Sequence, residues 1–292
     1  MSAVIELTDL TKYYGKQRGI QDVSFAVNEG EIFGFIGPNG AGKSTTIRTL
    51  LALFRPTSGS ATIFGLDCLK HASEIARDVG YVPSESAYYD KMKVRELLSY
   101  TAALYKTECR EKTERLCERL GLDQSRKIAD LSFGNKKKVG IVAALLHSPK
   151  LIILDEPTAG LDPLVQQTFF EILSEENGRG ATIFFSSHIL SEVQRFCQRV
   201  AILKEGRLLG VQAIKELRET GYKKVSITAK EDIPEAYFLE DNVAQLSQNG
   251  PAASFVYKGD VDNLFKKIAG LGVEDAFVEE PTLEEIFLHY YE

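Results

Sequence analysis

The stretch 37–45 reads Gly37-Pro38-Asn39-Gly40-Ala41-Gly42-Lys43-Ser44-Thr45. It follows an apolar run at residues 32–36 and precedes a helical stripe of apolar side chains at Ile47, Leu50, Leu51 and Phe54. Glycines at this spacing let successive backbone N–H groups converge on phosphate oxygens, and the positive end of the following helix favours anions. The stretch therefore predicts a phosphate-binding loop for a nucleoside triphosphate.

Two side chains of this loop have distinct expected roles. Lys43 is expected to reach the β- and γ-phosphates, and Ser44 is expected to ligate magnesium. A glycine-rich turn that binds nothing is the plain structural alternative. The remaining residues of the stretch are expected to contact the nucleotide: Gly37, Pro38, Asn39, Gly40, Ala41, Gly42 and Thr45.

Composition is typical of a globular protein, with 44% hydrophobic and 26% charged residues. The net charge of −6 gives no overall attraction to nucleic acid or anionic lipid. Four dispersed cysteines without a C-x-x-C pair predict reduced thiols in a cytosolic compartment, with neither a zinc site nor a disulfide framework. The longest helical apolar stretch, 139–146, is far shorter than the roughly 20 residues that span a bilayer, so we expect no membrane crossing.

The order of patterns along the chain predicts a doubly wound α/β core. Alternating apolar and polar residues at 3–36 and a short apolar run at 61–65 indicate strands. Uninterrupted apolar runs at 151–154 and 181–185 are typical of strands buried on both faces of a parallel sheet. Helical stripes predict a helical insertion at about residues 88–150.

A boundary is expected between residues 220 and 221, where a short helix ends and a new strand begins. Residues 1–220 then form the nucleotide-binding domain, and 221–292 form a small α+β unit. Near the end of the chain, Thr282-Leu283-Glu284-Glu285 reads as a capping box ahead of an apolar stripe. Within the small unit, strands are expected at 224–228, 254–257 and 273–278, with a helix before the last of them.

Chemically active side chains follow the two buried strands. Asp155 and Glu156 come after the first of these strands, and His188 comes after the second. Ligands of open α/β sheets bind at the carboxyl ends of strands, so these side chains are expected near the phosphates. Asp155 suits a magnesium ligand, Glu156 a general base for water, and His188 a hydrogen bond to the γ-phosphate. Each has a plain structural reading alone, but their joint occurrence after a phosphate loop favours catalysis.

Residues 4–215 resemble the ATPase subunit of an ATP-binding cassette (ABC) transporter, because they contain the motifs of that family in the same order. The signature motif, Leu131-Ser132-Phe133-Gly134-Asn135, distinguishes this family from other phosphate-loop proteins, and Ser132 is expected to cap the helix that follows. The other motifs are the Walker A loop at 37–45, the Walker B strand at 151–156, the D-loop at 159–162 and the switch histidine His188.

The resemblance implies a P-loop NTPase fold: a RecA-like parallel-sheet core, an antiparallel β subdomain, the helical insertion and the small α+β C-terminal domain. It also implies ATP hydrolysis with magnesium, in which two ATPase subunits meet head to tail. Ser132 and Gly134 of one subunit would then contact the γ-phosphate held by Lys43 of the other. Asp162 belongs to the D-loop beside that nucleotide. Tyr14 is placed like the residue that stacks on adenine, with Tyr13 less suited.

The same resemblance implies partners. They are a second copy of the chain or a paired ATPase, and integral membrane permease subunits that dock around residues 84–100, which puts the chain at the cytoplasmic face of the membrane. Residues 280–287 resemble the tail of ATPases that serve drug, antibiotic and polysaccharide exporters, where this unit assists dimer contact or regulation. A stabilising appendage is the alternative for this unit.

Other functions remain open at this point. A soluble cassette ATPase acting on nucleic acid or ribosomes usually carries two cassettes or a long coiled-coil insertion, and neither is visible here. A GTPase or kinase would share the loop, but the signature motif would then have no purpose. The chain could also be a non-hydrolysing ATP-gated module, although Glu156 and His188 argue against it. No nucleic acid is expected as a partner.

The chain departs from the family pattern at Ser84 and at two positions of the signature motif, and a lysine run needs an interpretation. Ser84, followed by Glu85, stands where the family usually has a glutamine near magnesium and the attacking water. The signature motif has Phe133 in place of glycine and Asn135 in place of glutamine. The run 136–138 is three lysines, which we interpret as a solvated helix turn rather than a nucleic-acid site.

Overall fold

The computed structural model describes residues 2–85, 87–106, 108–218, 222–238 and 242–279. The chain forms two compact units that divide between Val211 and Gln212. This division falls within strand β10 (Arg207–Ala213), earlier than the boundary expected at residues 220 and 221. The short helix α8 (Ile214–Arg218), which the sequence analysis assigned to the first domain, therefore groups with the second unit. Each unit is described here by itself.

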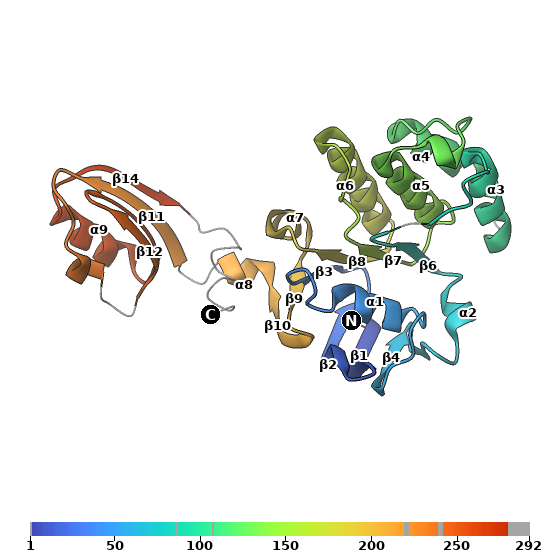
Figure 1. Cartoon of the computed structure of the whole chain (residues 1–292), viewed down its shortest axis with the longest axis horizontal. Helices are drawn as coiled ribbons and strands as arrows, with labels where there is room; N and C mark the ends of the chain where they lie inside the picture. Colours follow the sequence, from blue (N-terminus) through green and yellow to red (C-terminus); the bar gives the residue numbers. More distant parts are fainter. Residues whose placement is uncertain (1, 86, 107, 219–221, 239–241, 280–292) are drawn as a thin grey trace. The chain divides into compact units, whose positions relative to one another are not determined.

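The first unit is built on a six-stranded sheet (Figure 1). Strands β3, β6, β7, β8 and β9 are joined by parallel pairings. Every residue of β7 and β8 is buried, which confirms the prediction of strands covered on both faces. Strand β3 is also buried throughout, although its residues were assigned to the alternating region 3–36. The strand order is β10, β9 (Arg199–Lys204), β3 (Ile32–Ile36), β8 (Thr182–Ser187), β7 (Leu151–Asp155) and β6 (Val79–Val82).

An antiparallel sheet lies on one side of the central sheet, and helix α1 (Lys43–Leu50) lies between them (Figure 1). Their shared core is aromatic: Phe25 stacks on Phe33 and on Phe184, with ring centroids 5.5 and 6.0 Å apart. Ile47 of α1 is fully buried in the same cluster. The strand order of this sheet is β2 (Gln17–Asn28), β1 (Ala3–Tyr14), β4 (Ser58–Ile63) and β5 (Leu66–Asp67).

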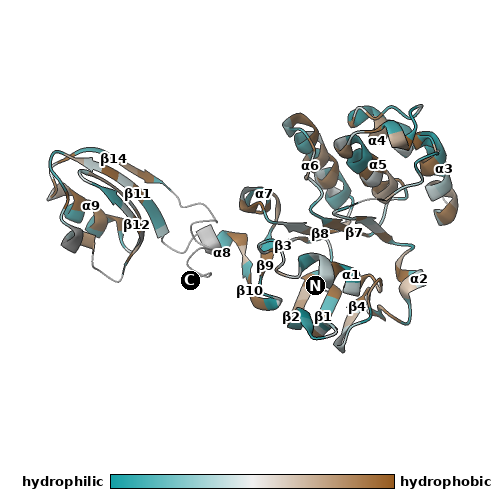
Figure 2. Ribbon diagram, viewed as in Figure 1, coloured by the Kyte–Doolittle hydropathy of each residue, from teal (hydrophilic) through white to brown (hydrophobic). Residues whose placement is uncertain are grey.

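Helices cover the opposite side of the central sheet (Figure 1). Helix α6 (Pro163–Gly178) packs on β8, and α7 (Leu190–Phe196) packs on β3 and β8. The expected helical insertion contains α3 (Val94–Tyr105), α4 (Arg110–Arg119), the 3₁₀ turn η1 (Ile128–Asp130) and α5 (Phe133–Leu145). Both α3 and α4 contact α5, and α5 contacts β6. The four-residue helix α2 (Ala72–Ile75) precedes β6. Figure 2 shows apolar residues gathered in the strands of the central sheet.

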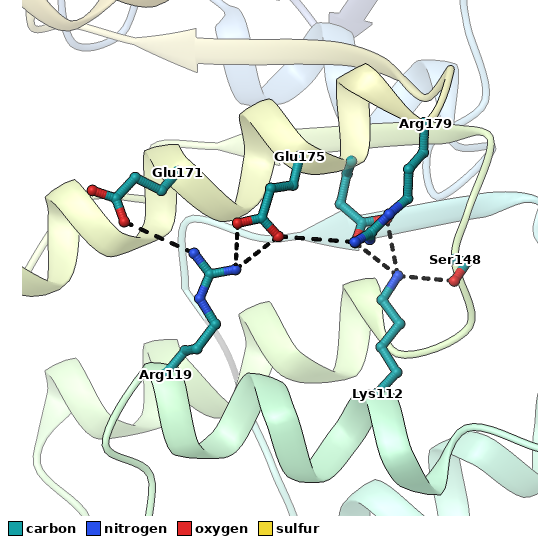
Figure 3. A network of polar contacts seen from close by, with 7 residues as sticks. Lys112, Arg119, Ser148, Glu171, Glu175 and Arg179 are labelled. Atoms are coloured by element: carbon teal, nitrogen blue, oxygen red, sulfur yellow. Dashed lines mark hydrogen bonds and ion pairs between the residues drawn. The ribbon is translucent and has the colours of Figure 1, made fainter.

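An ion-pair network joins the insertion to the core between α4 and α6 (Figure 3). Lys112 Nζ lies 2.9 Å from Glu176, which is only 3% exposed, and it also donates to Ser148 Oγ. Arg119 makes two hydrogen bonds to Glu175, of 2.7 and 2.8 Å. Burial lowers the pKa of Lys112, and the Glu176 carboxylate opposes that shift. The network therefore compensates the buried charges of Lys112 and Glu176 between the helical insertion and the core.

The Lys112→Met variant is expected to lower the free energy of unfolding by about 3 kcal/mol, because removing one partner of a buried ion pair leaves the other charge poorly compensated. Arg179, 2.7 Å from Glu176, keeps part of that compensation. Urea unfolding followed by circular dichroism measures the loss. Arg110→Ala is the matched control on the same helix, because its pair with Glu114 is exposed and should contribute nothing measurable. Equal stability of both variants would contradict the prediction.

The second unit contains a four-stranded antiparallel sheet with helix α9 (Val261–Ala269) packed on it. The sheet order is β12 (Val243–Asn249), β13 (Ala252–Lys258), β11 (Tyr222–Ala229) and β14 (Val273–Glu279). A 3₁₀ turn, η2 (Glu235–Phe238), precedes β12. The strands β11, β13 and β14 confirm the expected ones, whereas β12 was missed because its sequence is mainly polar. The capping box at 282–285 lies outside the described residues.

Two expectations from composition can be compared with the structure. All four cysteines are buried thiols, and burial raises the pKa of Cys68 to about 12 and that of Cys117 to about 11. In the described part of the chain, no helix is both long enough and apolar enough to cross a membrane.

Candidate active site

The loop after β3 has a backbone that requires glycine at several positions. Gly40 and Gly42 have φ angles of 80° and 105°, in the left-handed region that favours glycine. At Gly37 the constraint is a close approach, since a Cβ atom there would lie 2.4 Å from the carbonyl oxygen of Leu203. Helix α1 begins at Lys43, directly after the loop. The loop therefore presents a helix N-terminus, as predicted.

A pocket of about 400 Å³ lies over this loop. Most of the residues predicted to contact the nucleotide line it, together with Ser84 and Glu156, whereas Glu85 is not among the lining residues. Sequence reasoning missed three of the lining residues, because they belong to an alternating strand pattern that carries no motif. The lining consists of Tyr14, Gln17, Arg18, Gly19, Asn39, Gly40, Gly42, Lys43, Ser44, Thr45, Ser84 and Glu156.

Of the three predicted catalytic side chains, Lys43 and Glu156 line this pocket, and His188 contacts Glu156. Lys43 is 5% exposed, and its Nζ donates to the carbonyl oxygens of Gly37 at 2.7 Å and Pro38 at 3.3 Å. The same Nζ lies 3.3 Å from Glu156 Oε1. On the other side of that carboxylate, His188 Nδ1 lies 3.2 Å from Oε2. Residues that follow three different strands therefore form one connected polar cluster.

Glu156 has an unusual backbone conformation, with a φ angle of 48°. For a residue with a side chain this left-handed conformation costs about 1–3 kcal/mol. The backbone N–H of Glu156 donates to the carbonyl oxygen of Ser186 on β8, at 3.2 Å. The packing around the ends of β7 and β8 thus holds Glu156 in a strained conformation, a kind of strain that gathers at functional sites.

Asp155 is fully buried and only partly hydrogen-bonded. Its Oδ1 accepts from Ser186 Oγ at 2.9 Å, while Oδ2 has no hydrogen-bond partner within the described residues. A buried carboxylate oxygen without a partner is costly, so the site is suited to a cation. Magnesium prefers oxygen ligands, and Ser44 supplies a hydroxyl at the neighbouring pocket. The donor set of Asp155 and Ser44 therefore fits magnesium.

Tyr14 and Tyr13 differ in their surroundings. Tyr14 lines the pocket with its hydroxyl 3.4 Å from Thr45 Oγ1, and its ring meets Phe54 edge-on. Tyr13 instead donates to Gln21 and is not part of the pocket lining. A planar ligand in this pocket can therefore reach the Tyr14 ring and not that of Tyr13.

Ser132 and Gly134 lie outside the pocket, on the first turn of α5. Ser132 is exposed and caps the helix as predicted, because its Oγ accepts from the backbone N–H of Asn135. A Cβ atom at Gly134 would lie 2.4 Å from the carbonyl oxygen of Gly160, so the first turn of α5 packs closely on the loop after β7.

Asp162 is also outside the pocket lining, as are Gly37, Pro38 and Ala41 of the loop. Its Oδ1 accepts from the backbone N–H of Val165 at 3.0 Å, which makes Asp162 the N-cap of α6. Phe133, the departure in the signature motif, is 56% exposed and its ring lies against Gly160. One copy of the chain therefore brings Lys43, Glu156 and His188 into contact, whereas Ser132, Gly134 and Asp162 are not among the residues that line the pocket.

Comparison with known proteins identifies the family. The family model described as ABC transporter matches residues 20–159. The bacitracin transport ATP-binding protein BcrA of Bacillus licheniformis is 35% identical over 297 residues, which cover 99% of this chain and 97% of that protein. The chain belongs to the ABC transporter family. It is an ATP-hydrolysing subunit of that family, as the motifs predicted.

Other relatives agree with this assignment. The linearmycin resistance ATP-binding protein LnrL of Bacillus subtilis is 30% identical, over 98% of this chain and 97% of that protein. A solved structure of an ATP-binding subunit of an ABC transporter is 35% identical with a TM-score of 0.69, and covers 74% of this chain and 92% of that one. The dimeric structure of MJ0796, a bacterial ABC transporter cassette, is 25% identical with a TM-score of 0.67, and covers 72% and 98%.

One interpretation of the ABC signature helix was wrong. The three lysines at 136–138 were expected to form a solvated turn, but Lys137 is only 2% exposed. Its Nζ donates to the carbonyl oxygens of Pro83 and Ser84, both at 2.9 Å. Helical periodicity was the available signal, because residue 137 lies on the same face of α5 as the buried Ile141 and Ala144.

The Gly37→Ala variant is expected to be less stable by about 1–3 kcal/mol, because the added methyl group must displace backbone at Leu203. The same shift should weaken ATP binding, since the loop carries the phosphate-facing N–H groups. Thermal unfolding with and without ATP measures both effects. Gly178→Ala is the control, since nothing lies within 4 Å of its Cβ position, and it should not lower stability. A Gly37→Ala protein as stable as the parent would contradict the prediction.

Proposed function

We propose that this chain powers an exporter of the drug or antibiotic type by ATP-driven pairing of two ATPase subunits. The observation that carries the proposal is the separation, within one copy, of the Lys43 pocket from Ser132 and Gly134. The names of two relatives that match nearly the whole chain support the substrate class, since one is a bacitracin transport protein and the other a linearmycin resistance protein. The C-terminal unit would act as an accessory domain of this ATPase.

Lys43 and Glu156 are proposed to change partners when ATP binds. In the structure the Lys43 ammonium contacts two loop carbonyls and Glu156. The γ-phosphate carries more negative charge than a single carboxylate and would draw Lys43 away. Glu156 would then be able to accept a proton from the attacking water, help that is worth about 10²- to 10⁴-fold in rate. His188, on the other side of this carboxylate, would hydrogen-bond the γ-phosphate and sense its loss.

Asp155 and Ser44 are proposed to hold magnesium. Asp155 Oδ2, which has no hydrogen-bond partner among the described residues, and the Ser44 hydroxyl are both oxygen donors of the kind that magnesium prefers. Bound there, magnesium would supply positive charge that offsets the negative charge of the phosphates. Ser186 keeps the Asp155 carboxylate oriented through its hydrogen bond to Oδ1. Tyr14 would stack on the adenine at the opposite end of the pocket.

The second half of each ATP site is proposed to come from a second copy. Ser132 is exposed at the N-terminus of α5, where the helix dipole and free N–H groups favour an anion. In a head-to-tail pair, this helix end would face the γ-phosphate held by Lys43 of the other copy. The dimeric MJ0796 cassette shows that a related fold forms a dimer. Hydrolysis would remove the shared contacts and let the copies part.

We expect Glu156→Gln protein to be a monomer without nucleotide and a dimer with ATP, because loss of the base blocks turnover and preserves the ATP contacts. Adding Ser132→Asp should abolish the dimer, since a carboxylate would face the γ-phosphate. Sedimentation with and without saturating ATP, at low salt, measures both.

Ser132→Asn in the same Glu156→Gln background is the matched control. Aspartate and asparagine cap helices about equally well, so the two variants differ in charge and not in helix capping. The asparagine variant should therefore still dimerise with ATP. Equal dimerisation of the aspartate and asparagine variants would contradict the head-to-tail arrangement, and ATP binding without any dimer of Glu156→Gln protein would contradict self-pairing.

The membrane subunits are proposed to dock at an apolar pocket of about 380 Å³ between α1, α3, α5 and the loop after β6. Leu53, at its mouth, is 60% exposed, and Tyr88 and Tyr105 also line it. This location overlaps the segment 84–100 that the sequence suggested. Because both the core and the insertion contribute to the lining, a helix from a membrane subunit seated there would follow their relative movement. The chain would then lie at the cytoplasmic face of the membrane.

Leu53→Glu is expected to reduce co-purification with the membrane subunits of its transporter by at least about tenfold, because a carboxylate in an apolar contact costs more than 1.4 kcal/mol. Detergent extraction followed by affinity purification of the ATPase measures the yield of membrane subunits. Leu164→Glu is the control, since Leu164 is 77% exposed on α6 and lies outside this pocket. Both variants should retain ATP-driven dimerisation. Equal recovery of the membrane subunits with both variants would contradict the docking site.

A further inference from the structure

Lys137 is a buried cation on the signature helix that the mechanism above does not use. It lies on α5 and is only 2% exposed. Lysine side chains are almost never fully buried unless they are paired. An ammonium group has three protons to donate, and Lys137 donates hydrogen bonds of 2.9 Å to the backbone carbonyls of Pro83 and Ser84. A solvated helix turn therefore does not account for the burial of Lys137.

The two carbonyls that Lys137 binds belong to a segment of the nucleotide pocket. Strand β6 ends at Val82, and Pro83 and Ser84 follow it directly. Ser84 lines the pocket beside Lys43 and Glu156. A nucleotide that displaces Ser84 must therefore also act on the Lys137 ammonium.

The other end of the connection is the signature motif. Ser132 caps α5, five residues before Lys137, which corresponds to about 7.5 Å along the helix axis. Because α5 is a continuous helix, a force applied at Lys137 moves Ser132 and Gly134 with it. Lys137 thus joins the pocket for one ATP to the motif that would face the other ATP.

The charge of Lys137 strengthens this connection. Hydrogen bonds from an ammonium group are roughly twice as strong as those between neutral groups. Burial lowers the pKa of Lys137, while the carboxylates of Asp155 and Glu156 favour its charged form. These two carboxylates belong to the active site itself, so the Lys137 ammonium also responds to the charge gathered there.

We propose that Lys137 is a positioning residue that transmits occupancy of the nucleotide pocket to the signature motif, through its hydrogen bonds to the Pro83 and Ser84 carbonyls. The inference rests on the proposed head-to-tail dimer. It predicts that the two ATP sites of a dimer are coupled through each copy's own α5. Removing the ammonium would leave ATP binding to one copy intact and would weaken the response of Ser132 and Gly134 to it.

The test uses the full chain in the Glu156→Gln background, with Lys137→Met added. Binding of a fluorescent ATP analogue to dilute monomer and sedimentation at saturating ATP give the two dissociation constants. We expect the analogue affinity to stay within about twofold and dimerisation to weaken by at least about tenfold, within the 5- to 150-fold range typical of coupling between sites. Lys138→Met, one residue further along the helix, is the matched control and should change neither constant.

Several outcomes would overturn the inference. Dimerisation of Lys137→Met as tight as that of the parent would show that no coupling passes through the ammonium. Equal losses of analogue binding and dimerisation would assign Lys137 to the pocket alone. If Lys137→Met fails to fold, Lys137→Gln keeps a donor to the carbonyls and should give an intermediate dimerisation constant, and misfolding of both would assign Lys137 to stability only. Failure of the Glu156→Gln parent to dimerise would instead contradict the proposed function, and this inference with it.

Discussion

The parallel alignment of four neighbouring strands is the constraint on which the rest of the site depends. Parallel strands end at the same edge of a sheet, and here β3, β8, β7 and β6 are neighbours in that order. The segments that follow them carry Lys43, His188, Glu156 and Ser84, which are far apart in the sequence. Without this alignment, the contacts of Glu156 with Lys43 and His188 would not form. The order of the strands therefore decides which residues meet at the site.

Charge at this edge is concentrated and incompletely compensated. Glu156 is held in a strained backbone conformation between two basic side chains, and Asp155 retains a buried oxygen without a partner within the described residues. Both features cost stability in a resting protein, and both favour a ligand that brings phosphate charge and a cation. Ser132, which would contribute to the phosphate contacts in a pair, is exposed at the start of α5. This arrangement suits a single ABC subunit to binding ATP, and in the proposed pair the second subunit would enclose the nucleotide.

Two buried lysines anchor helix α5 to the rest of the unit. Lys137 lies on α5 itself, and Lys112 lies on the adjacent helix α4. Lys137 ties α5 to the carbonyls after β6. Lys112 ties the adjacent helix α4 to Glu176 of α6, whose N-cap is Asp162 of the D-loop. A buried cation needs acceptors or an opposite charge at hydrogen-bonding distance, so only a few arrangements of the helices allow these contacts. The insertion is therefore attached to the core by directional charge contacts as well as by apolar packing.

The phosphate loop, the strands buried on both faces, the capped signature helix and the family could all be predicted from the amino-acid sequence. These features depend on local spacing: glycines set backbone angles, apolar runs mark strands covered on both faces, and Ser132 caps the helix that it precedes. The polar strand β12, the unit boundary within β10 and the place of Gln17, Arg18 and Gly19 in the nucleotide pocket were decided only by tertiary structure. Each of these features depends on which distant segment of the chain packs against the residues concerned. The spacing of residues within one segment carries little information about such packing.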